Sequence, residues 1–233
     1  ELFNSKLGLP HKVKGAGVED EDIKACIRGH RNKSQSVNGL VTVGVDVGRW
    51  LHYVVQEWSL TKNVDIHAGA ICKTLEIGRV SSFEELDTMM LNFRPHQCVI
   101  DANPERRKAY EFANRFWGFV RLCFYGNNVN GKTIHEGKDD MEHMVTVDRT
   151  SWLDLSLGRF KNHSISLPLD TPLEFKEHIK ALIRVPGVDS DGNPTAKYVN
   201  SKADHYAHAN NYSEIALPFA VGMGQAQNIT SAV

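Results

Sequence analysis

The nine residues LVTVGVDVG at 40–48 decide the fold class of this 233-residue chain. β-branched side chains dominate the stretch, and such residues favour strands. The run is almost wholly apolar, which indicates a strand buried within a sheet. Asp46 interrupts the run, and a carboxylate is costly to bury without a partner. The stretch therefore predicts a central strand whose single acid is either functional or well paired.

The segments after this strand predict an antiparallel meander. Residues 51–60 alternate well enough for a partner strand, and residues 64–77 give a third strand after a short connection. Ser82 and Glu85 then form a capping-box pattern, which predicts a helix that runs to about Asn92. Consecutive strands joined by short connections usually lie side by side in a sheet.

A strand–helix–strand unit follows the meander. The apolar run 97–101 is a predicted strand, 104–117 is a predicted helix with Pro104 in its first turn, and 119–125 is another predicted strand. This length fits a right-handed βαβ unit, whose two strands are parallel. We therefore predict an α/β protein with a mixed sheet, part antiparallel meander and part parallel strands, flanked by helices.

The second half of the chain predicts an extra hairpin and a late helix. A polar turn cluster at 189–193 lies between the short segments 183–185 and 196–199, a pattern typical of a β-hairpin. A helix is expected over 201–217, ended by Pro218. The remaining expected elements are a strand at 144–147, a helix at 150–160 and a segment at 173–182 that suits either a helix or a strand.

Three parts are expected along the chain: a leader over 1–39, a body over 40–221 and a mobile polar tail over 222–233. The chain begins with Glu1 and no Met, so we expect an excised domain. No apolar run nears the ~20 residues that a membrane span needs, so no membrane partner is expected. The four cysteines form no CxxC pair, and those in predicted strands suit buried free thiols in a reducing, cytoplasmic compartment.

The net charge of −1 argues against a globally basic nucleic-acid binder, but the positive charge is uneven. Basic residues crowd the leader and the helix expected at 104–117. Four of them are candidate contacts for DNA phosphates: Arg49, Arg106, Arg107 and Lys108. Solvated helix faces, and packing at a strand end for Arg49, are the alternatives.

Three acids occupy positions that suit a metal centre. Asp46 lies in the central strand, Asp101 ends a second apolar strand, and Asp204 lies in the first turn of the last expected helix. Ligands gather at the carboxyl ends of strands in α/β folds. Three clustered carboxylates could bind two divalent cations, Mg²⁺ or Mn²⁺, which together hydrolyse phosphodiester bonds. Without a cation such acids would repel one another.

Each acid also has a structural interpretation. Asp46 could belong to a tight turn or be a paired polar group in the core. Asp101 could cap the helix that follows it, and Asp204 could oppose the dipole of its own helix. It is the combination of the three in this order that favours catalysis.

Polar residues next to Asp204 are candidates for a supporting role. His205 follows it directly, and His208 lies one turn further on the same helix face. Lys202 could neutralise a phosphate. For all three, a place on the surface is the alternative.

Three motifs in the chain resemble the acidic motifs of large terminase nuclease domains from tailed phages, which are RNase H-like proteins: GVDVGR at 44–49, VIDANPERRKAY at 99–110 and ADHYAHANNYSEIAL at 203–217. The opening ELFNSKLGLP at 1–10 is similar to the segment that follows the ATPase domain in those proteins. The first motif is shared with many RNase H-like enzymes, and the opening is the more specific sign. The resemblance covers essentially the whole chain.

The resemblance implies a subunit of a DNA-packaging motor in the host cytoplasm. It implies that the domain cuts double-stranded DNA, and that its partners are an ATPase domain in the same full-length chain, the portal protein and the small terminase subunit. Asp46, Asp101 and Asp204 would then be the ligands of two cations, with Asp46 between them. The hairpin near 183–199 resembles a terminase hairpin that touches or gates DNA. No fourth clear acid lies beside the site; His205 and His208 stand there instead.

Other function classes stay open. A sugar-kinase or actin-like ATPase also opens with a GxDxG strand, but the second glycine-rich phosphate strand of those proteins is not found in the sequence. GNNVNGKT at 126–133 has the spacing of a phosphate-binding loop, although a strand rather than the required helix is expected after it. A junction resolvase, another RNase H-like nuclease and a non-catalytic RNase H-like binding module are the remaining alternatives.

Overall fold

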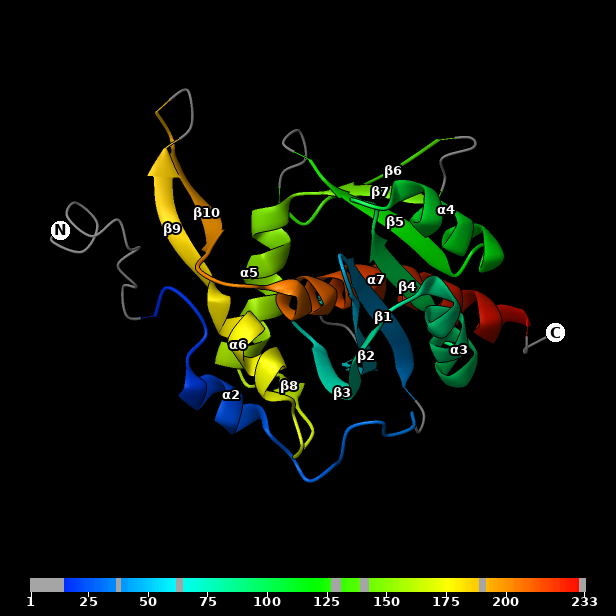
Figure 1. Cartoon of the computed structure of the whole chain (residues 1–233), viewed down its shortest axis with the longest axis horizontal. Coiled ribbons are helices and arrows are strands. Elements are labelled where there is room, and N and C mark those ends of the chain that lie inside the picture. Colours follow the sequence, from blue (N-terminus) through cyan, green and yellow to red (C-terminus); the bar gives the residue numbers. More distant parts are fainter. Residues whose placement is uncertain are drawn as a thin grey trace, which may run out of the picture.

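The computed structural model describes residues 15–36, 39–61, 65–126, 131–138, 143–188 and 192–230. Within these ranges, eight strands form one sheet in the order β6-β7-β5-β4-β1-β2-β3-β8, and two more form a separate hairpin (Figure 1). Three features singled out in the sequence lie outside the described residues, wholly or in part: the opening segment 1–10, positions 127–130 of the loop-like stretch and the hairpin tip at 189–191.

Five strands form the centre of the sheet: β1 (Leu40–Val47), β2 (Leu51–Leu60), β3 (Ala70–Val80), β4 (Gln97–Asp101) and β5 (Val120–Tyr125). β2 is antiparallel to β1 and β3, whereas β4 is parallel to β1 and β5. The predicted meander and the predicted parallel unit are therefore confirmed. The order β3-β2-β1-β4-β5, with these directions, is that of an RNase H-like fold.

Three shorter strands extend the sheet: β6 (Ile134–Glu136), β7 (Met144–Val147) and β8 (Ile165–Ser166). β7 lies where the sequence predicts a strand, parallel to β5. β8 was missed because two residues are too few to show an alternating pattern. β3 begins later than predicted, because the chain before it turns through a backbone hydrogen bond from Gly69 to Asp65.

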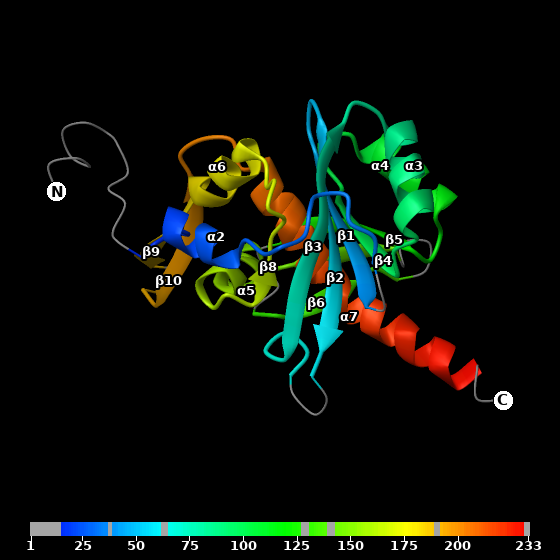
Figure 2. The same cartoon turned by 90° about the horizontal axis from the view of Figure 1, so that it is seen from below.

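Helices cover both faces of the sheet (Figure 2). α3 (Phe83–Phe93) and α4 (Arg106–Arg115) lie on one face, and α2 (Asp20–Cys26), α5 (Arg149–Lys161), α6 (Leu173–Ala181) and α7 (His205–Thr230) lie on the other. α3 begins with the predicted capping box at Ser82 and Glu85. The segment that suited either a helix or a strand is the helix α6.

The two faces of β1 differ in chemistry. Its valines pack into the core that lies under α3 and α4: Val41, Val43, Val45 and Val47. Thr42, Gly44 and Asp46 alternate with these valines and therefore face α7. Thr42 Oγ1 lies 2.7 Å from Ser213 Oγ of that helix. The acid in the central strand is thus directed towards α7.

Gly44 allows α7 to rest directly on β1. A Cβ atom at Gly44 would overlap the carbonyl oxygen of Ala209 and the amide nitrogen of Ser213, and would lie 2.9 Å from the carbonyl carbon of Tyr212. Only glycine fits here, because the groups in the way are helix backbone. The glycine therefore sets how closely the helix approaches the strand, two residues before Asp46.

α7 continues through Pro218, where the sequence predicts its end. The helix runs from His205 to Thr230 with the proline inside it. A proline removes one backbone donor and crowds the preceding turn. Leu217 and Ala220 are fully buried on either side of it, however, and this packing holds the helix together. The predicted helix end is wrong, and residues 222–230 of the predicted tail belong to α7. The division of the chain at 39 and 221 stays a prediction.

The predicted hairpin consists of β9 (Leu182–Val188) and β10 (Pro194–Asn200), which are antiparallel. It extends away from the sheet (Figure 1). Its base is fixed to α5, because Arg184 Nε and the Tyr198 hydroxyl each donate a 2.8 Å hydrogen bond to Asp154 Oδ1. The hairpin is therefore anchored at its base.

Two further expectations concern the thiols and the membrane. All four cysteines are free and buried, as predicted for those in strands. Among the helices in the described ranges, none has the length and apolar character needed to cross a membrane.

Candidate metal centre

Asp46 and Asp101 lie at the carboxyl ends of two neighbouring parallel strands. Val45 of β1 is the register partner of Ile100 of β4, so the two acids are the next residues along adjacent strands. Both acids follow a residue that faces α3 and α4, so both face α7. Adjacent strands are about 4.8 Å apart. The two carboxylates are therefore neighbours on the same face of the sheet.

The pKa of Asp101 reflects its burial and its closeness to Asp46. Burial raises the pKa of Asp101 to about 6, and the nearby charge of Asp46 contributes in the same direction. A 3.0 Å hydrogen bond from the amide nitrogen of Asn103 to Asp101 Oδ1 and the charge of His208 act against this rise. A cation between the two acids would remove the repulsion.

The structural interpretation of Asp101 as a helix cap is wrong. α4 begins at Arg106, and the residue in its N-cap position is Glu105. Asp101 instead accepts the hydrogen bond from Asn103 two residues on. Asp46 is only 6% exposed and lies within a strand rather than in a turn. Asp46 is therefore not a turn residue, whereas Asp101 forms a local Asx-turn with Asn103 and does not cap α4.

Asp204 directly precedes α7 and is followed by His205, which hydrogen-bonds Asp46. Oδ2 of Asp204 lies 3.3 Å from Nε2 of His208, one turn along the chain, as the sequence predicts. Burial alone would raise the pKa of Asp204, but the hydrogen bond with His208 and nearby positive charge lower it overall. The charge of His208 also acts on Asp101. Histidines of α7 thus link to each of the three acids: His205 to Asp46, and His208 to Asp204 and, through its charge, to Asp101. That the three carboxylates form one metal site stays a prediction.

Tyr125, at the end of β5, holds the ring of His208. Its hydroxyl oxygen accepts a 3.1 Å hydrogen bond from Asn211 Nδ2 and lies 3.0 Å from His208 Nδ1. In the neutral form of His208, Tyr125 can donate its proton to Nδ1, which leaves the ring proton on Nε2, facing Asp204. Sequence reasoning missed Tyr125, although its position at a strand end is the same signal that identified Asp101.

Arg149, the first residue of α5, brings a positive charge to this cluster. Its Nη2 lies 3.4 Å from His208 Nε2, and its charge contributes to the lowered pKa of Asp204. Arg149 was also missed. A basic residue in the first turn of a helix opposes the helix dipole. This unfavourable placement of a positive charge could have identified Arg149 from the sequence, because residues that break a local preference tend to mark functional positions.

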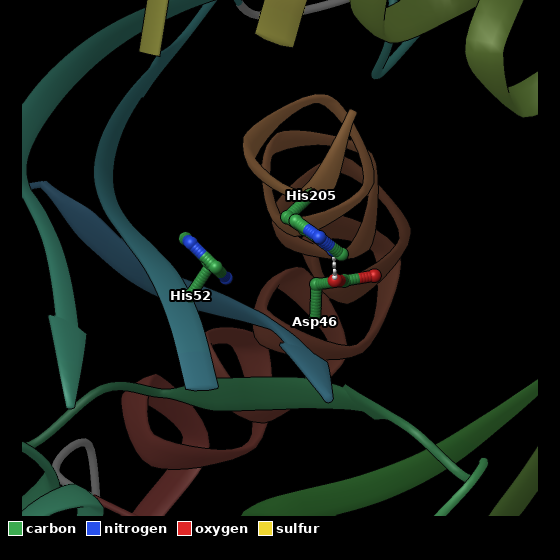
Figure 3. A group of neighbouring side chains, drawn as sticks. All are labelled: Asp46, His52 and His205. Atoms are coloured by element: carbon green, nitrogen blue, oxygen red, sulfur yellow. Dashed lines mark hydrogen bonds and ion pairs between the residues drawn. The ribbon is translucent and has the colours of Figure 1, made fainter. Parts of the chain in front are cut away.

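One group in the described part of the chain offers ligand atoms that all lie within 4.8 Å of one another: Asp46, His52 and His205 (Figure 3). Nδ1 of His205 lies 2.9 Å from Asp46 Oδ2, and this hydrogen bond raises the pKa of His205. His52 is the cross-strand partner of Asp46. Burial, helped by the nearby His205, lowers the pKa of His52 to about 4, so its ring is neutral at pH 7. The sequence pointed to His205 and missed His52.

Arg49 and Lys108 line one cleft beyond the end of β1. Lys108 is paired with Glu105 at 2.6 Å, and Arg107 is paired with Glu111 at 3.0 Å, both within or next to α4. The structure thus brings two of the four candidate phosphate contacts together, in a cleft that also contains acids. Their role in DNA binding stays a prediction.

The remaining basic candidates lie elsewhere. Arg106 stacks its guanidinium 5.4 Å from the centre of the Phe124 ring. Lys202 is exposed, and its charge acts on Glu177 of α6. Whether Lys202 neutralises a phosphate stays a prediction.

Comparisons with known proteins find similar solved structures. No protein-family model matches the chain, and no curated protein sequence matches it. The large terminase nuclease from thermophilic phage G20c aligns over 82% of this chain and 94% of its own, with 10% identity and a TM-score of 0.49. The large terminase nuclease domain of Thermus phage P74-26 aligns over 82% of this chain and 91% of its own, with 10% identity and a TM-score of 0.47.

The chain is similar in fold to large terminase nuclease domains. A large terminase from another thermophilic bacteriophage is longer: the alignment covers 81% of this chain and 42% of that chain, with 9% identity and a TM-score of 0.45. At such identities the shared property is the fold, and the chemistry of this chain has to come from its own residues.

Proposed function

We propose that this chain is a metal-dependent endonuclease domain that cuts double-stranded DNA. The main support is the position of Asp46 and Asp101 at adjacent strand ends on one face of the sheet. Asp204 directly precedes His205, the residue that hydrogen-bonds Asp46. Carboxylates this close are unfavourable unless positive charge lies between them. A site that binds divalent cations would explain why two acids lie side by side at these strand ends.

The donor set fits hard divalent cations. Mg²⁺ and Mn²⁺ prefer oxygen ligands and keep several of their waters, so three carboxylates are sufficient protein ligands for two ions. Asp46, Asp101 and Asp204 would hold them, with Asp46 shared between the two. The pKa of Asp101 is raised to about 6, which means that its ionised form is unfavourable without a metal. A bound cation would stabilise that ionised form.

The protein's own residues would position the reacting groups. When bound, the cations would supply a more acidic water and stabilise negative charge at the phosphate. Tyr125 fixes the ring of His208, and His208 in turn holds Asp204. Arg149 places a guanidinium beside the same acid, where it is suited to neutralise a phosphate oxygen.

The DNA would approach the carboxyl edge of β1 and β4. Arg49 and Lys108, in the cleft beyond β1, would contact phosphates of the duplex, and Arg106 and Arg107 lie on the adjoining α4. Contacts of this kind are independent of base sequence. The cut would therefore show little sequence preference.

We also propose the setting that the sequence resemblance implies. The domain would act in viral DNA packaging in the host cytoplasm, linked to an ATPase domain in the same full-length chain, with the portal protein and the small terminase subunit as partners. Among the similar solved structures are terminase nucleases with bound magnesium or cobalt, and a large terminase in complex with ADP.

A plasmid assay tests the nuclease activity. Purified protein should nick and linearise supercoiled plasmid with Mg²⁺ or Mn²⁺ and should be inactive in EDTA. Asp46→Asn should abolish cutting while the circular dichroism spectrum and the melting temperature stay those of a folded protein. Asp170→Asn is the matched control, because this exposed acid lies outside the site and the amide keeps an oxygen for its bond with Asn32.

Three results would overturn the proposal. Cutting that persists in EDTA, or in the Asp46→Asn variant, would exclude the metal mechanism. A folded protein that binds duplex DNA but never cuts it would identify a binding module. Cutting confined to four-way junctions would identify a resolvase.

A further inference from the structure

His52 is a buried polar side chain without a structural task. It is 3% exposed, and neither ring nitrogen has a hydrogen-bond partner among the described residues. Oε1 of Glu174 lies 3.9 Å from Nε2, beyond hydrogen-bond distance. A buried polar group left unsatisfied costs roughly 1–3 kcal/mol. The nitrogens of this buried ring are therefore candidates for binding a ligand.

The ring of His52 is held in place by other rings. His205 stacks on it with ring centres 4.8 Å apart and an angle of 8° between the planes. Tyr206 and His178 meet it edge-on, with ring centres 4.7 Å and 5.7 Å away. The ring is thus held by its neighbours next to Asp46, where its nitrogens could bind a cation.

His205 also reaches Asp46, from the start of α7. It is the first residue of α7, and Figure 3 shows its ring directed at the carboxylate of Asp46. The 2.9 Å hydrogen bond from His205 to Asp46 occupies a place that a cation could take. His178 is tied elsewhere, because its Nδ1 accepts a hydrogen bond from the amide nitrogen of Tyr206.

We propose that Asp46, His52 and His205 form a cation position with two nitrogen ligands, which binds Mn²⁺, Co²⁺ or Zn²⁺ in preference to Mg²⁺. Imidazole suits these metals, whereas Mg²⁺ prefers oxygen. The position shares Asp46 with the proposed nuclease site and so rests on that proposal for its function. Its nitrogen ligands come from β2 and α7 and are separate from Asp101 and Asp204. The two sides of Asp46 would thus differ in the metal they favour.

Electron paramagnetic resonance of bound Mn²⁺ tests the nitrogen ligands without any assay of cutting. The whole chain, freed of metal and loaded with one equivalent of Mn²⁺, should show ¹⁴N modulation of the electron spin echo. His52→Gln and His205→Gln should each reduce that modulation and weaken Mn²⁺ or Zn²⁺ binding, measured by calorimetry, by at least about ten-fold. Mg²⁺ affinity should change less than about two-fold. His135→Gln, an exposed histidine on β6, is the matched control.

The outcomes separate this inference from the nuclease proposal. Absence of ¹⁴N modulation in the unaltered protein overturns the inference, and this measurement needs no variant to fold. Binding of Mn²⁺ by His52→Gln as tight as that of the unaltered protein also overturns it. Nitrogen-bound Mn²⁺ in a protein that cuts no DNA would support the site and contradict the nuclease. Mg²⁺-dependent cutting with no ¹⁴N modulation would support the nuclease proposal and contradict the nitrogen-ligand site.

Discussion

Nη1 of Arg149 donates a 3.0 Å hydrogen bond to the backbone carbonyl of Tyr198. Tyr198 belongs to β10, so this bond joins the hairpin to the side chain that contacts His208 beside Asp204. The hairpin and the acid cluster are therefore connected by one guanidinium. A displacement of β10 would move the charge that lies next to the proposed metal site.

Removal of this guanidinium should slow cutting far more than it weakens the fold. Arg149→Ala should lower the single-turnover rate of plasmid cleavage by about 100-fold, the loss typical of a group that stabilises charge in the transition state. Arg149→Lys should recover part of the rate, because a point charge remains. Arg94→Ala, an exposed position at the end of α3, is the control. A rate unchanged by Arg149→Ala would exclude the role.

The raised pKa of Asp101 predicts that the metal-free protein loses stability as the pH rises. The folded pKa is about 6, against an ordinary value of 3.8. The group's contribution is fully present below pH 3.8 and is lost as the pH rises through 6, on the order of 3 kcal/mol in total. Urea unfolding in EDTA between pH 4 and 7 should show this loss, and Asp101→Asn should flatten it. Asp87→Asn, which alters an acid paired with Arg115, should leave it in place.

Gly44 should tolerate no side chain. Gly44→Ala places a methyl group against the backbone of α7, so the free energy of unfolding should fall by about 2 kcal/mol or more. Gly158→Ala in α5 is the matched control, because a Cβ there meets nothing within 4 Å. That change should be neutral or should stabilise the helix by up to about 1 kcal/mol. Equal stability of the two variants in urea would contradict the packing described for α7.

A buried ion pair joins α5 to α7. Glu214, which is 1% exposed, accepts hydrogen bonds from Arg159, and His67 Nδ1 lies 3.1 Å from its Oε1. Burial would raise the pKa of Glu214, but Arg159 and His67 lower it overall, so the pair's stability is lost as the pH falls through that lowered pKa. Glu214→Gln should cost about 3–5 kcal/mol in thermal or urea unfolding at pH 7.

A second variant separates loss of the pair from loss of packing. Arg159→Met combined with Glu214→Leu removes both charges and keeps similar volume, so it should recover much of the stability lost in Glu214→Gln. If the double variant is the less stable of the two, the cost lies in packing rather than in an unpaired buried charge.

DNA binding should depend steeply on salt if the cleft residues contact phosphates. In the Asp46→Asn background, which prevents cutting, Arg49→Ala or Lys108→Ala should each reduce the slope of log K against log salt by about one unit. Fluorescence anisotropy with a short duplex gives this slope. Lys138→Ala, at the far edge of the sheet after β6, should leave it unchanged. A slope insensitive to both cleft variants would place the phosphates elsewhere.

The sequence predicted those parts of the fold that local patterns encode. The apolar runs at 40–48 and 97–101 each predict a strand, and each contains one acid that stands out from its apolar neighbours. Both signals are present in the local sequence and need no knowledge of the fold. The helix through Pro218 was not predictable in this way. What holds it together is the burial of Leu217 and Ala220, which depends on the sheet beneath them.

The residues missed at the site share the same cause. His52 becomes a neighbour of Asp46 only through the antiparallel register of β1 and β2. Tyr125 and Arg149 meet His208 because β5, α5 and α7 converge there, although they are far apart in sequence. Acids in apolar strands are unusual enough to attract notice, whereas a histidine, a tyrosine or an arginine is common. Their roles emerge only once the chain is folded.

The packing of α7 against Gly44 of β1 also has a consequence for the order in which the proposed metal ligands come together during synthesis. Because ribosomes build proteins from the amino end, Asp46 and Asp101 are made well before Asp204 and the helix that follows it. Until that helix settles on β1, the cluster lacks one of its three acids. Under the proposed function, the cutting site would be complete only after this helix has docked on β1.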